Sequence, residues 1–291
     1  MIYYNTKNKK LENEKISKSL VFLYTSKLGR TILKVITKPV FSKISGFFIN
    51  TGISKIHIKK FIKKNHIDMN RYEKIKYRSF NDFFTRRLTE QAYLKTSKIE
   101  DLISPCDAKL SVYRIKNNLM VNVKNSIYSI ENLIQNEVPS AYQGGYCLVF
   151  RLSPDDYHRY HSIDNMIIKN TKKIEGLLHS VNPIVYKNYK VFTENSREVS
   201  LINTENFGEI LWVEVGALNI GKINNNDKKN LQRYEEKGYF SFGGYTIILL
   251  FKQNAITLDK DILYYSSKNI ETKVYYGDVI GKKTVIYNNQ K

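Results

Sequence analysis

The chain has 291 residues, which is enough to bury a sizeable core as one large domain or two modest ones. A hydrophobic fraction of 42% without low-complexity tracts excludes a disordered or fibrous protein. Two cysteines, Cys106 and Cys147, are too few for a disulfide framework or a cysteine-based metal cluster, and they favour a reducing compartment.

The net charge of +20 is concentrated near the N-terminus. Residues 1–90 carry 21 Lys and Arg against 6 Asp and Glu, a balance of +15, which leaves +5 for the other 201 residues. A basic third of this kind predicts an anionic partner, either nucleic acid or the surface of an anionic membrane. Solvated lysines on an ordinary surface are the alternative interpretation.

Residues 16–37 predict a basic amphipathic helix, with a break near Gly29. Its apolar positions follow helical spacing, and cations fall between them: Ile16, Leu20, Leu23, Leu28, Ile32 and Val35, with Lys18, Lys27, Arg30 and Lys34. Residues 54–69 repeat the pattern. Such helices either lie in a lipid interface or pack their apolar side on the protein's own core.

No stretch of the sequence predicts a transmembrane helix. The longest uncharged run of the basic region, "ISGFFINTGIS" at 44–54, is far shorter than the roughly 18 apolar residues that a span needs. The first fifteen residues also lack the apolar core of a signal peptide.

Residues 79–89, "SFNDFFTRRLT", predict a short helix that begins after Ser79. From about residue 100, short β-branched and aromatic runs alternate with Gly, Asn and Pro, and "VYYGDVIGK" near the end predicts a β-turn-β unit. We therefore expect an α+β fold. A basic helical region at 1–90 would precede a β-rich catalytic domain at 91–291.

Three polar stretches in the β-rich part are candidates for chemistry. The first, "SPCDAKL", contains Asp107, which on its own would indicate an Asx turn. The second, "RLSPDDYHRYH", holds His158 and His161, which would share a face on one helical turn. A metal site has no third ligand nearby, so acid–base use of these histidines is the better interpretation. The third, "GYFSFGGYTIILLF" at 238–251, places a glycine pair before an expected buried strand.

Seven motifs together resemble the phosphatidylserine decarboxylase family of the bacterial proenzyme type. In family order they are "FNDFFTRRL", "SPCDAKL", "RLSPDDYHRYH", "EGLLHSVNP", "FTENSREV", "VEVGALNIGKI" and "EEKGYFSFGGYTIILLF", which span most of the chain. Each motif alone is weak, but their order and spacing are specific.

The resemblance implies a self-cleaving enzyme that converts phosphatidylserine to phosphatidylethanolamine and CO2. In this family the chain cuts a Gly-Ser bond, and the serine becomes a pyruvoyl group that withdraws electrons as the carboxylate leaves. By motif position, Asp107 and His161 would act with that serine, and His158 would assist decarboxylation. The cut would leave residues 1–244 and 245–291 as a heterodimer.

The serine position, however, holds Tyr245, after Gly244. The phenol oxygen lies at the far end of the ring, so it cannot attack the neighbouring carbonyl, and without an oxygen on Cβ no pyruvoyl group can form. Thr246 could attack one bond later to give a ketobutyryl group, whereas Ser241 is out of register. Ala108 also departs from the glycine usual in the family, which would matter if the backbone there had a positive φ.

Three hypotheses follow for the function. The first is a phosphatidylserine decarboxylase. The second is a processing-dead homologue or engineered form that stays in one piece and still binds phosphatidylserine membranes. The third, a nucleic-acid binder, rests on charge alone and has no accompanying motif. Under the first two we expect a peripheral protein on the cytoplasmic face of the cell membrane, with phosphatidylserine and the anionic surface as partners and no metal.

Overall fold

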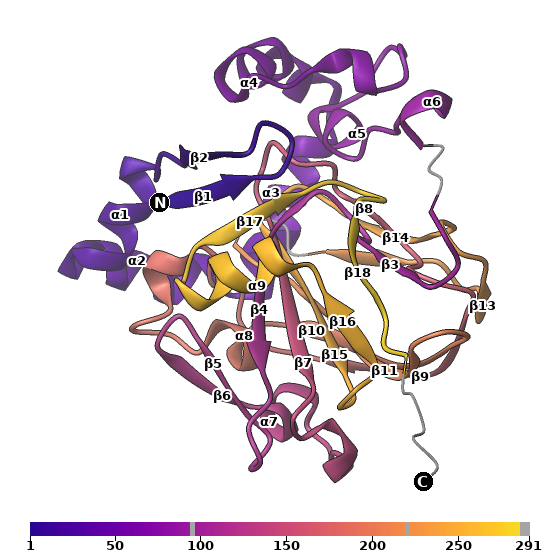
Figure 1. The fold of residues 1–291 in the computed structure, drawn as a ribbon. Helices are drawn as coiled ribbons and strands as arrows, with labels where there is room; N and C mark the ends of the chain where they lie inside the picture. The colour runs from indigo at the N-terminus through magenta and orange to yellow at the C-terminus, as the bar shows by residue number, and fades with distance from the viewer. Residues whose placement is uncertain (94–96, 219–221, 286–291) are drawn as a thin grey trace, which may run out of the picture.

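The computed structural model describes residues 1–93, 97–218 and 222–285. Most of the longer helices lie in the first third of the chain and most strands in the rest, which confirms the predicted α+β class (Figure 1). The helices of the described residues are α1 (Lys18–Thr25), α2 (Lys27–Ile36), α3 (Pro39–Asn50), α4 (Ile58–Asn65), α5 (Phe80–Phe84), α6 (Glu90–Tyr93), α7 (Ile130–Ile134), α8 (Val191–Glu194) and α9 (Lys260–Ser267). Short 3-10 turns are η1 (Gly52–His57), η2 (Met69–Arg71), η3 (Ser140–Tyr142) and η4 (Pro183–Val185).

A ten-stranded mixed sheet forms the body of the described residues, in the order β13-β9-β10-β11-β15-β7-β4-β17-β1-β2. Its strands are β1 (Ile2–Asn5), β2 (Lys10–Asn13), β4 (Ala108–Arg114), β7 (Tyr146–Leu152), β9 (Met166–Ile174), β10 (Arg197–Thr204), β11 (Gly208–Val215), β13 (Asn230–Leu231), β15 (Tyr245–Phe251) and β17 (Glu271–Val274). Smaller sheets are formed by β12 (Ile223–Asn225), β14 (Glu236–Phe240) and β8 (Arg159–His161), by β16 (Ile256–Leu258), β18 (Val279–Lys283) and β3 (Asp101–Ile103), and by β5 (Met120–Val123) and β6 (Ser126–Ser129).

Strand β15 is the buried strand that the apolar run predicted. All seven of its residues are buried, and it pairs antiparallel with β11 on one side and β7 on the other. Its side chains alternate between two cores, because successive residues of a strand point to opposite faces. Tyr245, Ile247 and Leu249 belong to one core, whereas Ile248 and Leu250 belong to the other.

The first residues of the chain depart from the predicted helical region. Residues 2–13 form the hairpin β1–β2, and β1 pairs in parallel with β17, so that Tyr3 lies opposite Glu271 (Figure 1). The hairpin therefore extends the central sheet of the β-rich part. The charged sequence around it has no strand pattern, and pairing with a segment almost 270 residues away supplies what the local sequence lacks.

The predicted helix at 16–37 is two helices that meet at Ser26. The extended backbone of Ser26 ends α1, and its side chain accepts a hydrogen bond of 2.9 Å from the Gly29 backbone N–H to begin α2. The break predicted near Gly29 is thus confirmed three residues before it, and Gly29 itself lies inside α2. A Cβ at that position would lie 2.3 Å from the Phe22 carbonyl oxygen, so the glycine allows the two backbones to approach closely.

Two local predictions are confirmed. Ser79 is the N-cap of α5, and its hydroxyl accepts from the Asp82 backbone N–H at 3.1 Å. Near the end of the chain, β17 and β18 flank a turn in which the Asp278 N–H donates to the Tyr275 carbonyl. The capping residue and the glycine-containing turn both act through neighbours in sequence.

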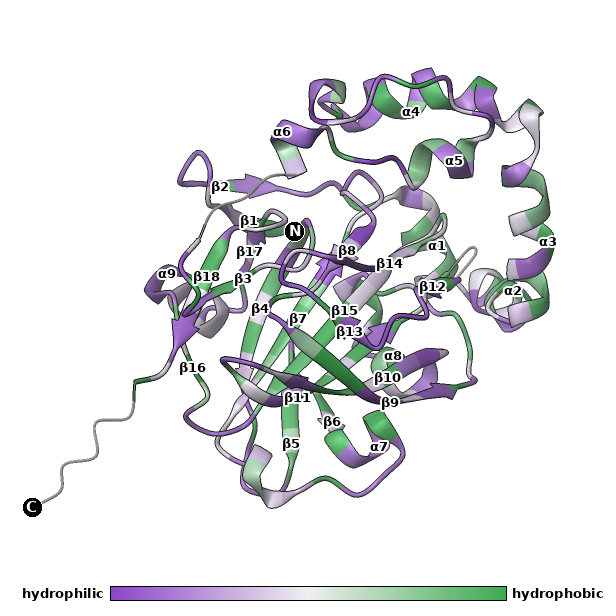
Figure 2. Cartoon of the chain, turned by 90° about the vertical axis from the view of Figure 1, so that its right-hand side faces the viewer, coloured by the Kyte–Doolittle hydropathy of each residue, from purple (hydrophilic) through white to green (hydrophobic). Residues whose placement is uncertain are grey.

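Helices α2 and α3 and the turn η1 expose a large share of their apolar side chains. Figure 2 shows hydrophobic residues along α2 and α3, which lie together at one side of the molecule. We call the exposed set the apolar helix surface: Leu28, Ile32, Val35, Val40, Phe41, Ile44, Phe47, Phe48, Ile53 and Ile56. Phe47 is 71% exposed and Ile53 is 77% exposed, whereas Leu20 and Leu23 of α1 pack against the core. Of the helices in the described ranges, none is both long and apolar enough to cross a bilayer.

Candidate active site

Tyr245 is the first residue of β15, and its side chain is fully buried. Its ring stacks on Phe240 with a centroid distance of 4.1 Å, and the His158 ring lies edge-on at 6.3 Å. Burial raises the pKa of the phenol, so the hydroxyl stays protonated. That hydroxyl reaches the Lys222 carbonyl only at 3.5 Å, which is a weak contact.

His158 is a neutral imidazole with one unused nitrogen. Its Nδ1 lies 2.8 Å from the Asp156 carbonyl oxygen, which can only accept, so Nδ1 carries the proton and Nε2 carries the lone pair. Nε2 is buried and has no hydrogen-bond partner within the described ranges. Burial, helped by the nearby charge of Arg86, lowers the pKa of His158 to about 3. An unprotonated base therefore lies beside residue 245.

His161 lies in a box of tyrosines, and both of its nitrogens are used. Nδ1 donates to the Tyr234 carbonyl at 3.1 Å, and Nε2 accepts from the Tyr157 hydroxyl at 3.1 Å. The Tyr276 ring lies 4.3 Å from the imidazole, and burial lowers the pKa of His161 to about 3. No hydrogen bond or ring contact between described residues joins His161 to Tyr245.

The strand geometry explains why the two histidines separate. Residues 159–161 form β8, so His158 and His161 are three residues apart along an extended chain rather than on a helical turn. In such a segment the side chains at i and i+3 point to opposite sides. The expectation that they share a face is wrong, and it is His158 that lies next to residue 245.

Asp107 comes directly before β4 and is held by Arg71 and by the backbone of Tyr276. Arg71 binds the carboxylate with both terminal nitrogens, at 2.9 and 3.3 Å, and the Tyr276 N–H donates to it at 2.8 Å. The Tyr276 ring faces His161, and the backbone N–H of His161 donates to the Pro105 carbonyl. Asp107 and His161 are thus neighbours across one residue, Tyr276, whereas the Tyr245 ring adjoins that of His158.

The backbone shows whether a side chain would be tolerated at the glycine pair and whether Ala108 is strained. A Cβ on Gly243 would lie 3.3 Å from the Leu218 carbonyl oxygen, whereas one on Gly244 would first meet Val181 at an ordinary 3.5 Å. Close approach therefore occurs at Gly243. Ala108 lies in β4, paired with Val274, and does not have a positive φ, so its departure from glycine causes no strain.

Sequence reasoning missed a buried charge network that ends at His158. The Asp156 side chain binds Lys273 of β17 and accepts the Ser153 N–H at 2.7 Å, while its carbonyl oxygen holds His158. These contacts fix the carbonyl that sets the His158 tautomer. The only sequence signal was the pair of adjacent aspartates in "SPDDYH". The lysine that binds Asp156, Lys273, lies 117 residues further along the chain.

The network continues through Arg151. Its guanidinium lies between Glu14, at 2.7 Å, and Glu271, at 2.6 Å. Lys109 adds a contact to Glu14 at 3.4 Å, and these charges lower the pKa of Glu14 to about 2 against the opposing effect of burial. The N-terminal hairpin is therefore joined to β7 and β17 by buried ion pairs. Nowhere in the described ranges do three or more His, Cys, Asp or Glu residues gather as a metal site would require.

Comparison with known proteins identifies close relatives of the whole chain. The family model described as phosphatidylserine decarboxylase matches residues 80–282. The phosphatidylserine decarboxylase proenzyme 2 of Clostridium acetobutylicum is 48% identical over 96% of this chain and 97% of its own. A phosphatidylserine decarboxylase proenzyme of Clostridium botulinum is 46% identical over 97% of this chain and 99% of its own, and one of Clostridium tetani is 42% identical over 97% and 98%.

Proposed function

The chain belongs to the phosphatidylserine decarboxylase family, and from that premise we propose that its fold is built to convert phosphatidylserine to phosphatidylethanolamine and CO2, with residue 245 as the reacting position. One observation carries this proposal. A buried, unprotonated His158 with a free Nε2 lies beside the first residue of β15, at the end of a glycine pair.

We assign the base at residue 245 to His158. Its Nδ1–H is fixed by the Asp156 carbonyl, so the lone pair of Nε2 is available to a hydroxyl on the Cβ of residue 245. His161 and Asp107, which the resemblance names as partners of the serine, both contact Tyr276, and no ring contact or hydrogen bond between described residues joins either of them to Tyr245. In this position they would orient the site rather than touch the reacting bond.

The pyruvoyl group that the resemblance implies would supply an electron sink for the departing carboxylate. The surroundings of residue 245 suit such a group, because a free imidazole nitrogen and a glycine pair flank it. Residue 245 itself does not, since Tyr245 has no oxygen on Cβ. The natural relatives named above are proenzymes, and cleavage before residue 245 would make this chain a heterodimer of 1–244 and 245–291.

The chemistry of Tyr245 therefore favours a second function for the chain as it stands. An uncut protein would bind phosphatidylserine membranes without turning the lipid over. The comparisons give this alternative no preference over decarboxylation, so it rests on residue 245 alone.

The test is Tyr245→Ser beside the parent chain. We expect the parent to remain one species of 34.1 kDa, and the variant to yield fragments of 244 and 47 residues and to release CO2 from carboxyl-labelled phosphatidylserine. Denaturing gels, intact-mass spectra and trapped CO2 measure these outcomes.

Tyr245→Ala is the matched control, because it leaves the same space beside Phe240 but brings no hydroxyl. Either large-to-small change costs about 3–5 kcal/mol of stability, so folding is checked first. A folded Tyr245→Ser chain that stays whole would contradict the assignment. A parent chain that already cuts itself would point to Thr246, whose buried hydroxyl has no partner among the described residues.

We also propose that the helical region docks the protein on an anionic membrane as a peripheral protein of the cytoplasmic face. Residues 18–65 contain eleven lysines and arginines and no aspartate or glutamate. The apolar helix surface lies among these cations, which suits insertion between headgroups while lysines reach lipid phosphates. Exposed phenylalanines of this kind favour lipid over nucleic acid as the anionic partner.

A further inference from the structure

A cavity of about 740 Å³ lies between helix α3 and the strands β9, β10, β12 and β14. Small or short residues of α3, Ser42, Gly46 and Asn50, line it on the helix side. Phe47 also lines the cavity while remaining 71% exposed, so the opening adjoins the apolar helix surface. The cavity is therefore accessible from the side of the protein that we propose faces the membrane.

The cavity carries a surplus of positive charge. Its lining contains four cations against two carboxylates: Lys43 of α3, Lys173 of β9, Arg197 of β10 and Lys222 before β12, with Glu175 and Glu198. Lys173 pairs with Glu198 at 3.3 Å, whereas no ion pair between described residues engages Lys43 or Lys222. Arg197 also borders the cavity, but its guanidinium is bonded to backbone carbonyls such as that of Leu133. Two exposed lysines from different elements are thus available to an anion.

The floor of the cavity adjoins residue 245. The Lys222 carbonyl accepts the Ser241 N–H at 3.2 Å and lies 3.5 Å from the Tyr245 hydroxyl, and both Lys222 and Ser241 line the cavity. The next residue, Ile223, pairs with Phe240, on which the Tyr245 ring stacks. The Tyr245 side chain therefore fills the space between the cavity wall and its own Cβ, and a serine at this position would leave that space to the end of a bound ligand.

We propose that this cavity binds the phosphodiester of a phospholipid headgroup, with the ammonium groups of Lys43 and Lys222 on the phosphate oxygens. An ammonium is a compact cation that suits a phosphate as a point charge. The headgroup's amino acid end points toward residue 245, and the acyl chains leave past Phe47 over the apolar helix surface. This inference rests on the proposed function, because it treats the ligand as the substrate of the same site.

The first experiment measures binding to the uncut parent chain, where no turnover interferes. Monomeric dihexanoyl-phosphatidylserine is titrated calorimetrically into the parent and into the double variant Lys43→Gln, Lys222→Gln. We expect the affinity to fall by about tenfold or more, the value of one or two charged hydrogen bonds. Both lysines are exposed, so the fold tolerates the change.

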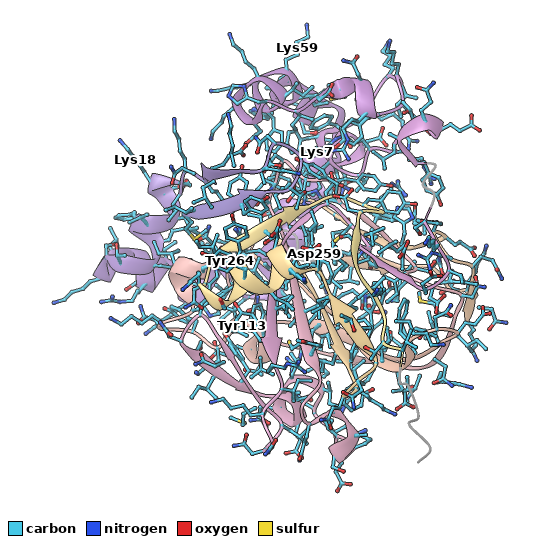
Figure 3. All side chains as sticks on the ribbon, viewed as in Figure 1. Lys7, Lys18, Lys59, Tyr113, Asp259 and Tyr264 are labelled. Atoms are coloured by element: carbon cyan, nitrogen blue, oxygen red, sulfur yellow. The ribbon has the colours of Figure 1, made fainter. Side chains whose placement is uncertain are left out.

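The matched control is Lys116→Gln, Lys260→Gln, which removes the same charge from two exposed lysines that lie outside residues 18–65 and do not line the cavity. Lys260 begins α9, the helix that carries Tyr264 in Figure 3. The affinity of this control variant should stay within about twofold of the parent. Equal losses in the two double variants would overturn the proposal, and so would an unchanged affinity in the cavity variant. Inorganic phosphate as competitor separates the sources, because displacement at the same concentration as the lipid would indicate a free-phosphate site and overturn the lipid assignment.

A second experiment keeps this inference apart from the proposed function. In the Tyr245→Ser background, the cavity variant should still cut itself, and its KM for the same short lipid should rise about tenfold while kcat changes little. Failure of Tyr245→Ser to cut would contradict the proposed function, while the titrations on the uncut chain would still decide the cavity. An unchanged KM would overturn the cavity assignment.

Discussion

The helical region and the central sheet handle charge in opposite ways. Residues 18–65 present lysines and arginines without a single carboxylate of their own, beside exposed phenylalanines and isoleucines. The sheet buries its charges as pairs, such as Lys237 with Glu214 at 2.5 Å and Arg151 between two glutamates. The cations of residues 18–65 are exposed to solvent, whereas these buried cations of the sheet are neutralised by neighbouring carboxylates.

This difference separates binding from stability. An exposed cation contributes little to the folded state, because water and salt screen it. Removing one partner of a buried ion pair lowers the stability strongly, because the charge that remains is buried and cannot be solvated. We therefore expect matched substitutions in the two regions to affect different measurements.

The largest expected effect is on stability, from Arg151→Met. The change removes the cation that Glu14 and Glu271 share and leaves them only the longer contacts with Lys109 and Lys124, so the free energy of unfolding should fall by about 3–5 kcal/mol. Lys59→Met, in the helical region, should change it by less than about 0.5 kcal/mol. Urea unfolding measures both, and similar losses in the two variants would remove the distinction between the regions.

The next effect concerns pH. His158 and His161 have a folded pKa of about 3, below the usual 6.5 of the unfolded chain, so the unfolded state binds more protons between these values. The stability that these two neutral histidines contribute is therefore fully present above pH 6.5 and is lost as the pH falls below it. Between pH 7.5 and 5.5 each histidine should cost about 1.4 kcal/mol. Asp155 and Glu214, whose pKa is raised, act in the opposite direction.

Substitution isolates the histidine contribution. His158→Gln should reduce the loss of stability between pH 7.5 and 5.5 by about 1.4 kcal/mol, the share of one histidine. His57→Gln, at an exposed position in η1, should leave the loss unchanged. Denaturant unfolding curves at the two pH values measure the free energy of unfolding of each variant. A decline that survives in the His158→Gln, His161→Gln double variant would have to come from other groups.

The smallest effect is expected on membrane binding. Lys55→Gln and Lys63→Gln should each weaken binding to phosphatidylserine vesicles by about 1 kcal/mol at low salt, and less at high salt. Lys116→Gln is the matched control, since its loop adjoins β5, at the end of the molecule opposite α4 (Figure 1). Co-sedimentation across a salt series gives the comparison, and equal binding of the parent to neutral and anionic vesicles would argue against docking.

Sequence patterns gave the parts of the fold that depend on neighbours along the chain. The Ser79 cap, the buried run of β15 and the turn before β18 were all predicted, because a cap, an apolar strand and a turn are local. The β1–β2 hairpin was not, since its stability comes from pairing with β17 and from Glu14 on Arg151. The break predicted near Gly29 lies at Ser26, but the sequence did not show that Gly29 allows the backbones of α1 and α2 to approach closely.

The candidate site divides in the same way. Motifs identified Asp107, His158, His161 and residue 245, but their arrangement depends on whether residues 158–161 are helical or extended. Only the three-dimensional structure shows that His158, and not His161, adjoins residue 245. Arg71 has no motif of its own, and its pairing with Asp107 becomes visible once η2 and β4 are brought together.

The path of the last 47 residues through the sheet determines how a protein cut before residue 245 would respond to dilution. Beyond residue 245 the chain enters the large sheet twice, as β15 between β11 and β7 and as β17 between β4 and β1. An ordinary pair of subunits separates when its concentration falls below the dissociation constant. Two pieces joined in this manner cannot separate without breaking the sheet, so a particle whose backbone is opened before residue 245 would come apart only as it unfolds, and dilution would act on it by lowering its free energy of unfolding. The freed chain end would stay at the mouth of β15, beside His158, for as long as the protein remained folded.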